Sequence, residues 1–286
     1  MAEKVFFNDK LIDAGRAKVP VTDAGLLYGA GLFETMRASN GVVFCLDDHL
    51  ERLFSSAEKL SINNTYTKKQ ITDAVYQLLE ANNLTEARLR LTLTSGSVSK
   101  DCQLKSTLLI TATKLEPYPA EYYKNGVLAV LTSYRQNLND PVYGHKTLNY
   151  LPRIMALNQA RMKMATEAIW FTVDNKLAEG CISNIFLVKD DTICTPTIET
   201  PVLPGIARKA VLQIAKQNNI ELIEKDLYID DCLGADEIFM TNVIMQVLPV
   251  VKLEKHTVGK GKIGAITKKL MQYFDECVKQ WCGKSK

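Results

Sequence analysis

Two residues of this chain could bring opposite charges to a reaction site. Lys146 follows a polar loop over residues 137–145, and its amine is either a nucleophile or an ordinary surface charge. Glu179 is flanked by the small residues Ala178 and Gly180, which indicates partial burial. A buried carboxylate usually has a cationic partner, which could be a basic side chain or the protonated ring nitrogen of a bound molecule. The residues alone leave both choices open.

Two further features could bind an anion. Pro204 and Gly205 form a turn directly before an expected helix, where backbone N–H groups and the helix dipole favour a phosphate. The same pair also suits an ordinary turn. Arg52 lies in an expected helix beside the core-facing Leu50 and Leu53. Its guanidinium either pairs with a carboxylate in solvent or binds phosphate oxygens in a bidentate manner.

The composition is that of an ordinary globular protein. The 286 residues are 47% hydrophobic and 23% charged, with a net charge of +3 and no stripe of Lys and Arg interleaved with aromatic residues. We therefore expect no nucleic-acid or membrane partner, and no segment is apolar over the length of a membrane span. Seven cysteines without a Cys-x-x-Cys pair predict reduced thiols in a cytoplasmic protein. Three separated histidines argue against a zinc or other metal site.

The first part of the chain has the periodicity of a small domain with mixed α and β structure. Thr67 is an expected N-cap, and Gln70 is placed to complete a capping box. Alternating leucines predict a later strand with Arg90 on its polar face. The expected elements are helices over 47–60 and 67–82 and strands over 87–95 and 107–113. Together they predict one α/β domain over residues 1–115.

Residues 116–125 contain prolines and tyrosines without periodicity, which predicts an interdomain linker. The remaining residues, 126–286, are expected to form a larger, β-rich domain with helices packed around it. Its expected strands cover 127–133, 168–173, 181–188, 192–195 and 237–240, and its expected helices cover 150–165, 206–218 and 263–281.

Gly25, Gly29 and Gly31 have a spacing that resembles a dinucleotide-binding loop. They lie too close to the N-terminus to follow the strand of a βαβ unit, and the acidic residue expected downstream is missing. We therefore reject a Rossmann fold. The glycines predict instead a close approach of the backbone at a pocket or a subunit interface.

Six segments, taken in order, resemble the class IV (fold-type IV) pyridoxal-phosphate-dependent aminotransferases. This family includes branched-chain aminotransferases, D-amino acid aminotransferases and aminodeoxychorismate lyases. The resemblance covers about residues 5–250. It implies an α/β (α+β) fold with a small N-terminal domain and a larger pseudo-barrel domain. The matching segments are Tyr28-Gly29-x-Gly31-x-Phe33-Glu34-Thr35-x-Arg37, His49-Leu50-Glu51-Arg52-Leu53, Lys146-Thr147-Leu148-Asn149-Tyr150, Glu179-Gly180-x-x-Ser183-Asn184-Ile185-Phe186, Leu203-Pro204-Gly205-Ile206-x-Arg208 and Asp236-Glu237-Ile238-Phe239-Met240-Thr241-Asn242.

The resemblance implies a role for each candidate residue. Lys146 would carry pyridoxal 5'-phosphate (PLP) as a Schiff base and move the proton at the reacting carbon. Glu179 would keep the pyridine nitrogen protonated, so that the ring acts as an electron sink. Arg52 and the backbone N–H groups of Ile206 and Ala207 would bind the phosphate.

Other matched residues would complete the same site. Tyr150 would lie near the ring oxygen of the cofactor. Arg90 would either bind a substrate carboxylate or form a structural ion pair. The remaining expected cofactor contacts are Ser183, Asn184, Gly205, Asn242 and Val243, and the expected substrate pocket consists of Tyr28, Phe33, Thr35 and Arg90.

The same machinery serves transamination and elimination, and departures from the family patterns bear on the choice. Ser95-Gly96 stands where D-amino acid aminotransferases carry arginine before the glycine, which argues against that activity. Branched-chain enzymes usually have glycine in place of Thr35 and Gly-Thr in place of Asn242-Val243. Their tyrosine also follows the lysine by five positions rather than four.

We therefore expect a 4-amino-4-deoxychorismate lyase, which releases 4-aminobenzoate and pyruvate for folate synthesis. Residues 33–37 and 240–242 are similar to that group. A branched-chain amino acid aminotransferase is the alternative. A D-amino acid aminotransferase fits less well, as does a non-catalytic relative, because Lys146 and Glu179 are both retained. The resemblance further implies a homodimer that acts on a small-molecule amino substrate.

Overall fold

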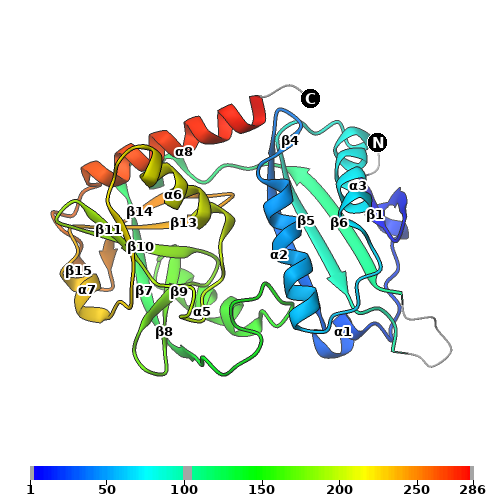
Figure 1. Ribbon diagram of the computed structural model, residues 1–286, viewed down its shortest axis with the longest axis horizontal. Helices are drawn as coiled ribbons and strands as arrows, with labels where there is room; N and C mark the ends of the chain where they lie inside the picture. The colour runs from blue at the N-terminus through cyan, green and yellow to red at the C-terminus, as the bar shows by residue number, and fades with distance from the viewer. Residues whose placement is uncertain (1–2, 99–104, 284–286) are drawn as a thin grey trace. The chain divides into compact units, whose positions relative to one another are not determined.

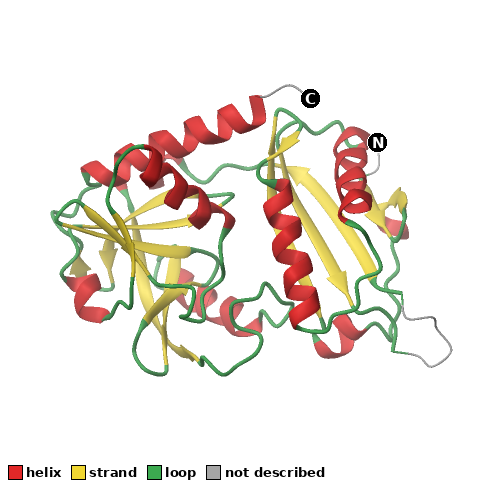
Figure 2. Cartoon of the chain, in the orientation of Figure 1, coloured by secondary structure: helices red, strands yellow, loops and turns green. Residues whose placement is uncertain are grey.

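The computed structural model describes residues 3–98 and 105–283 and divides the chain into two compact units (Figures 1 and 2). This division differs from the predicted continuous domain over residues 126–286, because residues 145–149 pair with a strand of the first unit. The first unit comprises Met1–Glu116, His145–Asn149 and Val278–Lys286, and the second comprises Pro117–Gly144 and Tyr150–Cys277.

The first unit is built on a six-stranded antiparallel sheet with the strand order β2-β1-β6-β5-β3-β4. In β5, buried leucines alternate with residues that include the exposed Arg88 and Arg90, so the predicted alternation is confirmed. The strands are β1 (Lys4–Phe7), β2 (Lys10–Asp13), β3 (Gly31–Ser39), β4 (Val42–Val43), β5 (Ala87–Thr94) and β6 (Thr107–Lys114).

Two amphipathic helices, α2 (Leu46–Lys59) and α3 (Lys68–Ala81), pack on one face of this sheet (Figure 1). The predicted capping box of α3 is confirmed: Thr67 Oγ1 accepts the Gln70 N–H, and Gln70 Oε1 accepts the Thr67 N–H. Two shorter elements, η1 (Ala14–Arg16) and α1 (Ala24–Tyr28), precede β3. The core between helices and sheet includes Leu32, Met36, Leu50, Leu53, Ile71, Val75, Leu78, Leu89, Leu91 and Ile110.

The segment that carries Lys146 is joined to the start of β3 by backbone hydrogen bonds. The Phe33 N–H donates to the Lys146 carbonyl, and the Leu148 N–H donates to the Gly31 carbonyl, each at 2.9 Å. A Cβ atom at Gly31 would lie 2.7 Å from Leu148 Cδ1 and 2.8 Å from the Leu93 carbonyl oxygen. The close backbone approach expected here is therefore present, and it allows this segment to lie directly against β3.

The second unit is built on a nine-stranded mixed sheet. Its main strand order is β12-β11-β10-β13-β14-β7-β8-β9, and β15 pairs with β14. The pairs β11–β12, β14–β7 and β7–β8 are parallel, and the others are antiparallel. The strands are β7 (Val127–Gln136), β8 (Glu167–Thr172), β9 (Leu177–Gly180), β10 (Asn184–Lys189), β11 (Thr192–Thr195), β12 (Leu222–Glu224), β13 (Glu237–Asn242), β14 (Gln246–Leu253) and β15 (His256–Thr257).

Two predicted elements of the second unit differ from the structure. The expected strand over 181–188 is interrupted, because the chain turns at residues 181–183 between β9 and β10. The expected linker contains the helix α4, which packs on β14. The helices are α4 (Ala120–Asn125), α5 (Leu151–Met162), α6 (Ile206–Gln217), α7 (Ile229–Leu233) and α8 (Ala265–Gly283).

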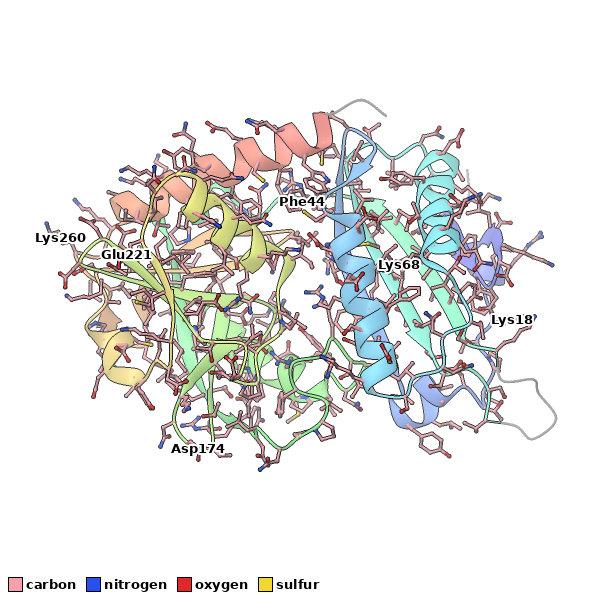
Figure 3. The ribbon with its side chains drawn as sticks, viewed as in Figure 1. Lys18, Phe44, Lys68, Asp174, Glu221 and Lys260 are labelled. Atoms are coloured by element: carbon pink, nitrogen blue, oxygen red, sulfur yellow. The ribbon has the colours of Figure 1, made fainter. Side chains whose placement is uncertain are left out.

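Charged side chains at the surface are distributed over both units. In Figure 3 the exposed Lys18, Asp174 and Lys260 point away from the ribbon, whereas Phe44 is buried. No helix among residues 3–98 and 105–283 is long and apolar enough to cross a membrane. Within the same residues six cysteines are free, and no cluster of side chains suits a metal ion.

A buried carboxylate joins β3 to α2. Glu34 is 1% exposed, and it accepts a hydrogen bond from His49 Nδ1 at 2.7 Å. Arg52 donates Nε to Glu34 Oε1 at 2.8 Å and Nη2 to Oε2 at 2.5 Å. Burial opposes the charge of Glu34, but the charge of Arg52 and the hydrogen bonds from His49 and Arg52 outweigh it. They lower the pKa of Glu34 to about 2.

The ring of His49 is neutral in this arrangement. Burial is the main cause of the lowered pKa of His49, and it outweighs the opposing effect of Glu34. Nε2 of His49 is buried without a hydrogen-bond partner in the described part of the chain. A proton on Nδ1 alone therefore leaves no buried N–H unsatisfied.

Glu34→Gln is expected to destabilise the protein by roughly 3–5 kcal/mol, because it leaves the guanidinium of Arg52 buried without a carboxylate. Urea unfolding at neutral pH measures this loss. Because the folded-state pKa of Glu34 lies below its ordinary value of 4.5, its stabilising contribution is present above that pH. The contribution is lost as the pH falls towards about 2.

Glu51→Gln, in the helix α2 that carries Arg52, is the control. Glu51 pairs with Lys68 at the surface, with side chains 71% and 49% exposed, and its loss should cost less than about 1 kcal/mol. Equal destabilisation by the two substitutions would contradict the role given to Glu34.

Candidate active site

Lys146 lies next to an aromatic ring and a guanidinium in the first unit. Its Nζ is 4.5 Å from the centroid of the Phe33 ring, and Arg90 Cζ is 3.8 Å from the same centroid. Arg90 is the cross-strand partner of Thr35. Leu32 belongs to the core beneath the helices, so the alternating Phe33 and Thr35 occupy the opposite face of β3. The structure thus brings four predicted residues together.

The predicted phosphate ligand Arg52 is buried rather than solvated. Its side chain is 9% exposed, and it donates hydrogen bonds from two of its nitrogen atoms to the carboxylate of Glu34. Burial is the largest cause of the lowered pKa of His49, and the positive charges of Arg52 and Lys146 lower it further. Both charges therefore act on the same histidine. Tyr28, at the end of α1, is by contrast 69% exposed. A contact between Arg52 and a phosphate stays a prediction.

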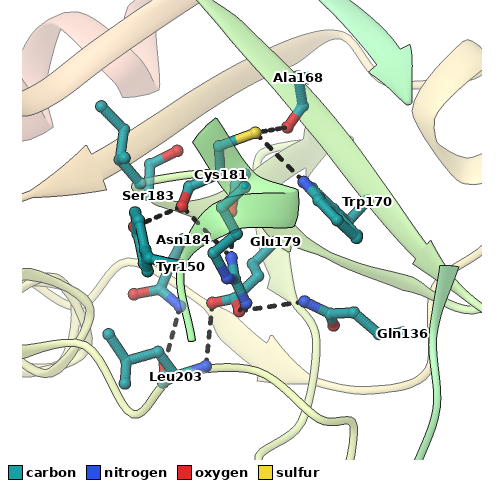
Figure 4. A network of polar contacts seen from close by, with 12 residues as sticks. Gln136, Tyr150, Ala168, Trp170, Glu179, Cys181, Ser183, Asn184 and Leu203 are labelled. Atoms are coloured by element: carbon teal, nitrogen blue, oxygen red, sulfur yellow. Dashed lines mark hydrogen bonds and ion pairs between the residues drawn. The ribbon is translucent and has the colours of Figure 1, made fainter. Parts of the chain in front are cut away.

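Glu179 accepts three hydrogen bonds inside the second unit (Figure 4). Arg153 Nη2 donates to Oε1 at 2.5 Å, and Gln136 Nε2 donates to the same oxygen at 3.3 Å. The Leu203 N–H donates to Oε2 at 2.9 Å. The carboxylate lies in β9 and is 3% exposed, so the predicted partial burial is confirmed, and a basic side chain is one of its partners.

Tyr150 stands directly before α5 and points to the turn that follows β9 (Figure 4). Its hydroxyl donates to the Cys181 carbonyl at 2.7 Å. Burial raises the pKa of Tyr150 despite the nearby charge of Arg153, so the phenol stays protonated. The hydroxyl is therefore a donor whose position is set by the turn.

Glu167 is a fully buried carboxylate that shapes this turn. It accepts the N–H groups of Ala168, Cys181 and Ile182 and the hydroxyl of Ser183, at 2.9–3.1 Å. Burial nevertheless raises the pKa of Glu167, because it outweighs these hydrogen bonds. The hydroxyl of the predicted cofactor contact Ser183 is thus engaged by the protein itself.

The turn before α6 leaves the start of that helix open. Gly205 is the N-cap residue, and in the described part of the chain no side chain caps the first N–H groups, which include those of Ile206 and Ala207. Asn184 Nδ2 donates to the Leu203 carbonyl at 2.9 Å. A Cβ atom at Gly205 would lie 1.9 Å from Asn184 Oδ1, so this close packing requires glycine. The predicted Asn184 and Gly205 therefore lie together at an uncapped helix N-terminus.

Asn242 uses its side chain to hold the loop between β13 and β14. Its Oδ1 accepts the N–H groups of Ile244 and Met245 at 2.9 and 2.8 Å, and its Nδ2 donates to the Ile182 carbonyl at 3.1 Å. Val243 is buried in the same loop. The structure therefore connects this predicted pair to the turn after β9, and a direct cofactor contact by either residue stays a prediction.

The described residues fit a cofactor that has a phosphate and a cationic ring. The open N-terminus of α6 suits a phosphate, and the buried Glu179 suits a protonated ring nitrogen. Gln136 Oε1 is buried without a hydrogen-bond partner in residues 3–98 and 105–283, and a bound molecule with a donor group would satisfy it. Covalent attachment of the cofactor to the amine of Lys146 stays a prediction.

Three residues that organise the site were not predicted from the sequence: Gln136, Arg153 and Glu167. Arg153 stands three positions after Tyr150, so the two share a face once α5 begins, and this spacing was a usable signal. Glu167 opens a wholly buried strand, where an acidic residue needs several donors. Gln136 carries no comparable signal, because its contact with Glu179 spans 43 positions.

The chain is similar in sequence to a known family and to proteins that have been named. The model of the amino-transferase class IV family matches residues 31–253. A protein of Methanocaldococcus jannaschii, provisionally named a branched-chain-amino-acid aminotransferase, is 37% identical over 97% of each chain. The D-alanine aminotransferase of Bacillus licheniformis is 31% identical over 93% of each chain.

Solved structures are similar over nearly the whole chain. The branched-chain amino acid aminotransferase of Escherichia coli has a TM-score of 0.92 and 29% identity, covering 100% of this chain and 97% of that one. A branched-chain enzyme from T.th., solved with pyridoxamine 5'-phosphate, has a TM-score of 0.90 and 25% identity, with 98% and 95% covered. A provisionally named 4-amino-4-deoxychorismate lyase of Legionella pneumophila has a TM-score of 0.84 and 25% identity, with 93% and 97% covered.

These matches confirm the predicted α/β fold and the predicted cofactor. The family model spans both units, and the pyridoxamine-phosphate complex has the same fold. Because the match includes the lysine segment, the buried carboxylate and the open helix N-terminus, the chain belongs to the class IV aminotransferases and is a PLP-dependent enzyme.

Proposed function

We propose that the enzyme transfers the amino group of a branched-chain amino acid to a 2-oxo acid. The observation that carries this proposal is the Phe33 ring, with Lys146 Nζ and the Arg90 guanidinium both close to it. An aliphatic amino acid has a side chain for the ring, a carboxylate for the guanidinium and an amine for the reacting centre. The similarity to branched-chain enzymes supports the same choice.

The residues have complementary tasks in this proposal. Bound PLP supplies an electron-withdrawing ring that acidifies the C–H bond beside the amino nitrogen. Lys146 attaches the cofactor, takes the proton from that carbon and delivers it again as general acid. Glu179 keeps the ring nitrogen protonated. Arg52 binds the phosphate, and so do the N–H groups at the start of α6.

The remaining predicted residues complete the proposed site. Tyr150 lies near the ring oxygen, and Arg90 binds the substrate carboxylate. Phe33 and Thr35 line the pocket on the face of β3 opposite the core that packs against α2 and α3. The further cofactor contacts proposed are Ser183, Asn184, Gly205, Asn242 and Val243, and Tyr28 is the further pocket residue.

The expected lyase activity is less well supported than the aminotransferase. Its support is the Legionella structure, together with Thr35 and Asn242 at positions where branched-chain enzymes usually differ. The relatives also include D-alanine aminotransferases, but Ser95 stands where their arginine was expected. Aminodeoxychorismate is therefore the second candidate substrate.

We also propose that the enzyme is a homodimer. The helices α1 and α5 each expose neighbouring apolar side chains, and a partner copy would cover them. They are Leu26, Leu27 and Tyr28 in α1, and Leu151, Ile154 and Met155 in α5. The predicted cytoplasmic location follows from the unpaired cysteines and belongs to the same proposal.

Purified enzyme should form glutamate from 2-oxoglutarate with leucine, isoleucine or valine as donor. Coupled assays of glutamate formation measure this activity, and D-alanine is the comparison donor. Aminodeoxychorismate is tested in parallel for release of 4-aminobenzoate and pyruvate. Release of aminobenzoate without any transfer from branched-chain donors would contradict the proposal and support the lyase.

Arg90→Ala should lower kcat/KM for the amino acid by about 10- to 100-fold, because a charged hydrogen bond to the carboxylate is worth about 1.5–3 kcal/mol. Steady-state kinetics measure the change. Arg88→Ala is the matched control, since Arg88 stands two residues earlier on the same exposed face of β5. Equal losses in the two variants would show that Arg90 has no specific role.

A further inference from the structure

Arg153 forms a buried ion pair with the carboxylate that is proposed to face the cofactor ring. Its Nη2 lies 2.5 Å from Glu179 Oε1, and the two side chains are 17% and 3% exposed. Its Nη1 donates to the carbonyls of Gly180 and Cys181 at 3.0 and 3.3 Å. The guanidinium therefore contacts Glu179 and the two residues that follow it.

The donors around Glu179 divide unequally between its two oxygens. Oε1 accepts from Arg153 and Gln136, whereas the Leu203 N–H donates to Oε2. A carboxylate oxygen has about two lone-pair directions. Among these contacts, Oε2 is thus the oxygen with room for the N–H of a ring nitrogen.

Arg153 is the cation that pairs with Glu179 inside the second unit. Burial opposes the charge of Arg153, but Glu179 outweighs it and raises the pKa of the guanidinium. Burial also raises the pKa values of Tyr143, Tyr150 and the Cys181 thiol, so these neighbours are neutral. The carboxylate and the guanidinium therefore form an ion pair beside these neutral groups, and the buried acid Glu167 lies on the other side of the Cys181 turn.

Arg153 also reaches the second group proposed to contact the ring. The Cys181 carbonyl accepts both the Tyr150 hydroxyl and Arg153 Nη1. Arg153 Cζ lies 6.0 Å from the Tyr150 ring centroid and 5.7 Å from that of Trp170. One guanidinium therefore connects the carboxylate and the phenol.

We propose that Arg153 is a positioning residue that tunes the protonation of the cofactor ring nitrogen. By neutralising Glu179, it reduces the attraction of the carboxylate for the ring proton, and it leaves Oε2 as the acceptor. A carboxylate without this cation would hold the ring nitrogen more strongly in its protonated form. The inference rests on the proposed placement of the PLP ring against Glu179.

The test is the ring-nitrogen 15N chemical shift of 15N-labelled PLP bound to the purified protein, because this shift reports protonation, recorded at a pH at which the wild-type ring nitrogen is half protonated. Arg153→Met removes the charge at similar length and should move the signal further towards the protonated value than in the wild type. Arg153→Lys keeps the charge and should restore the wild-type signal. Arg161→Met, at an exposed arginine of the same helix, should leave it unchanged.

A purely structural role of Arg153 gives another pattern. Arg153→Met and Arg153→Lys would then both leave the ring signal at its wild-type position, although either could lower the thermal stability. That result would overturn the proposal.

Glu179→Gln distinguishes this inference from the proposed function on which it rests. If the wild type binds no PLP, or if Glu179→Gln leaves the ring signal unchanged, the proposed cofactor site is wrong. If Glu179→Gln moves the signal and Arg153→Met does not, the cofactor site stands and the inference about Arg153 is wrong.

Discussion

Burying a charge costs several kcal/mol unless partners compensate it, and three buried carboxylates impose that constraint on this protein. Glu34 accepts hydrogen bonds from Arg52 and His49 in α2, and these bonds fix that helix on β3. Glu179 forms an ion pair with Arg153 in α5. Glu167 has no arginine or lysine among its hydrogen-bond donors in the described residues, and four N–H or O–H groups offset the cost of its burial only in part. Each carboxylate therefore fixes a piece of backbone or a cation that the proposed chemistry uses.

The position of Lys146 depends on the backbone rather than on its own side chain. Its carbonyl accepts from Phe33, and the following residues run beside Gly31. A short polar segment thereby becomes part of the first unit, while the chain on either side belongs to the second. Because β3 also carries Phe33 and Thr35, the same strand positions both the amine and the proposed pocket residues.

Local patterns predicted much of the fold, and long-range contacts account for what they missed. The alternation around Arg90 and the capping box at Thr67 depend on neighbouring residues, and both are present. The break after β9 depends on Glu167, which is 14 positions before Cys181, so no local pattern marks it. For the site, family motifs indicated the candidates. The ion pair of Arg153 joins α5 to β9, and this contact is visible only in the three-dimensional structure.

The proposed chemistry depends on covalent attachment of the cofactor to Lys146. Reduction of the purified enzyme with borohydride in the presence of PLP, followed by peptide mass mapping, locates that bond. We predict a phosphopyridoxyl group on the peptide that contains Lys146, and none after Lys146→Ala. Modification of another lysine in the wild type, or no modification at all, would contradict the account.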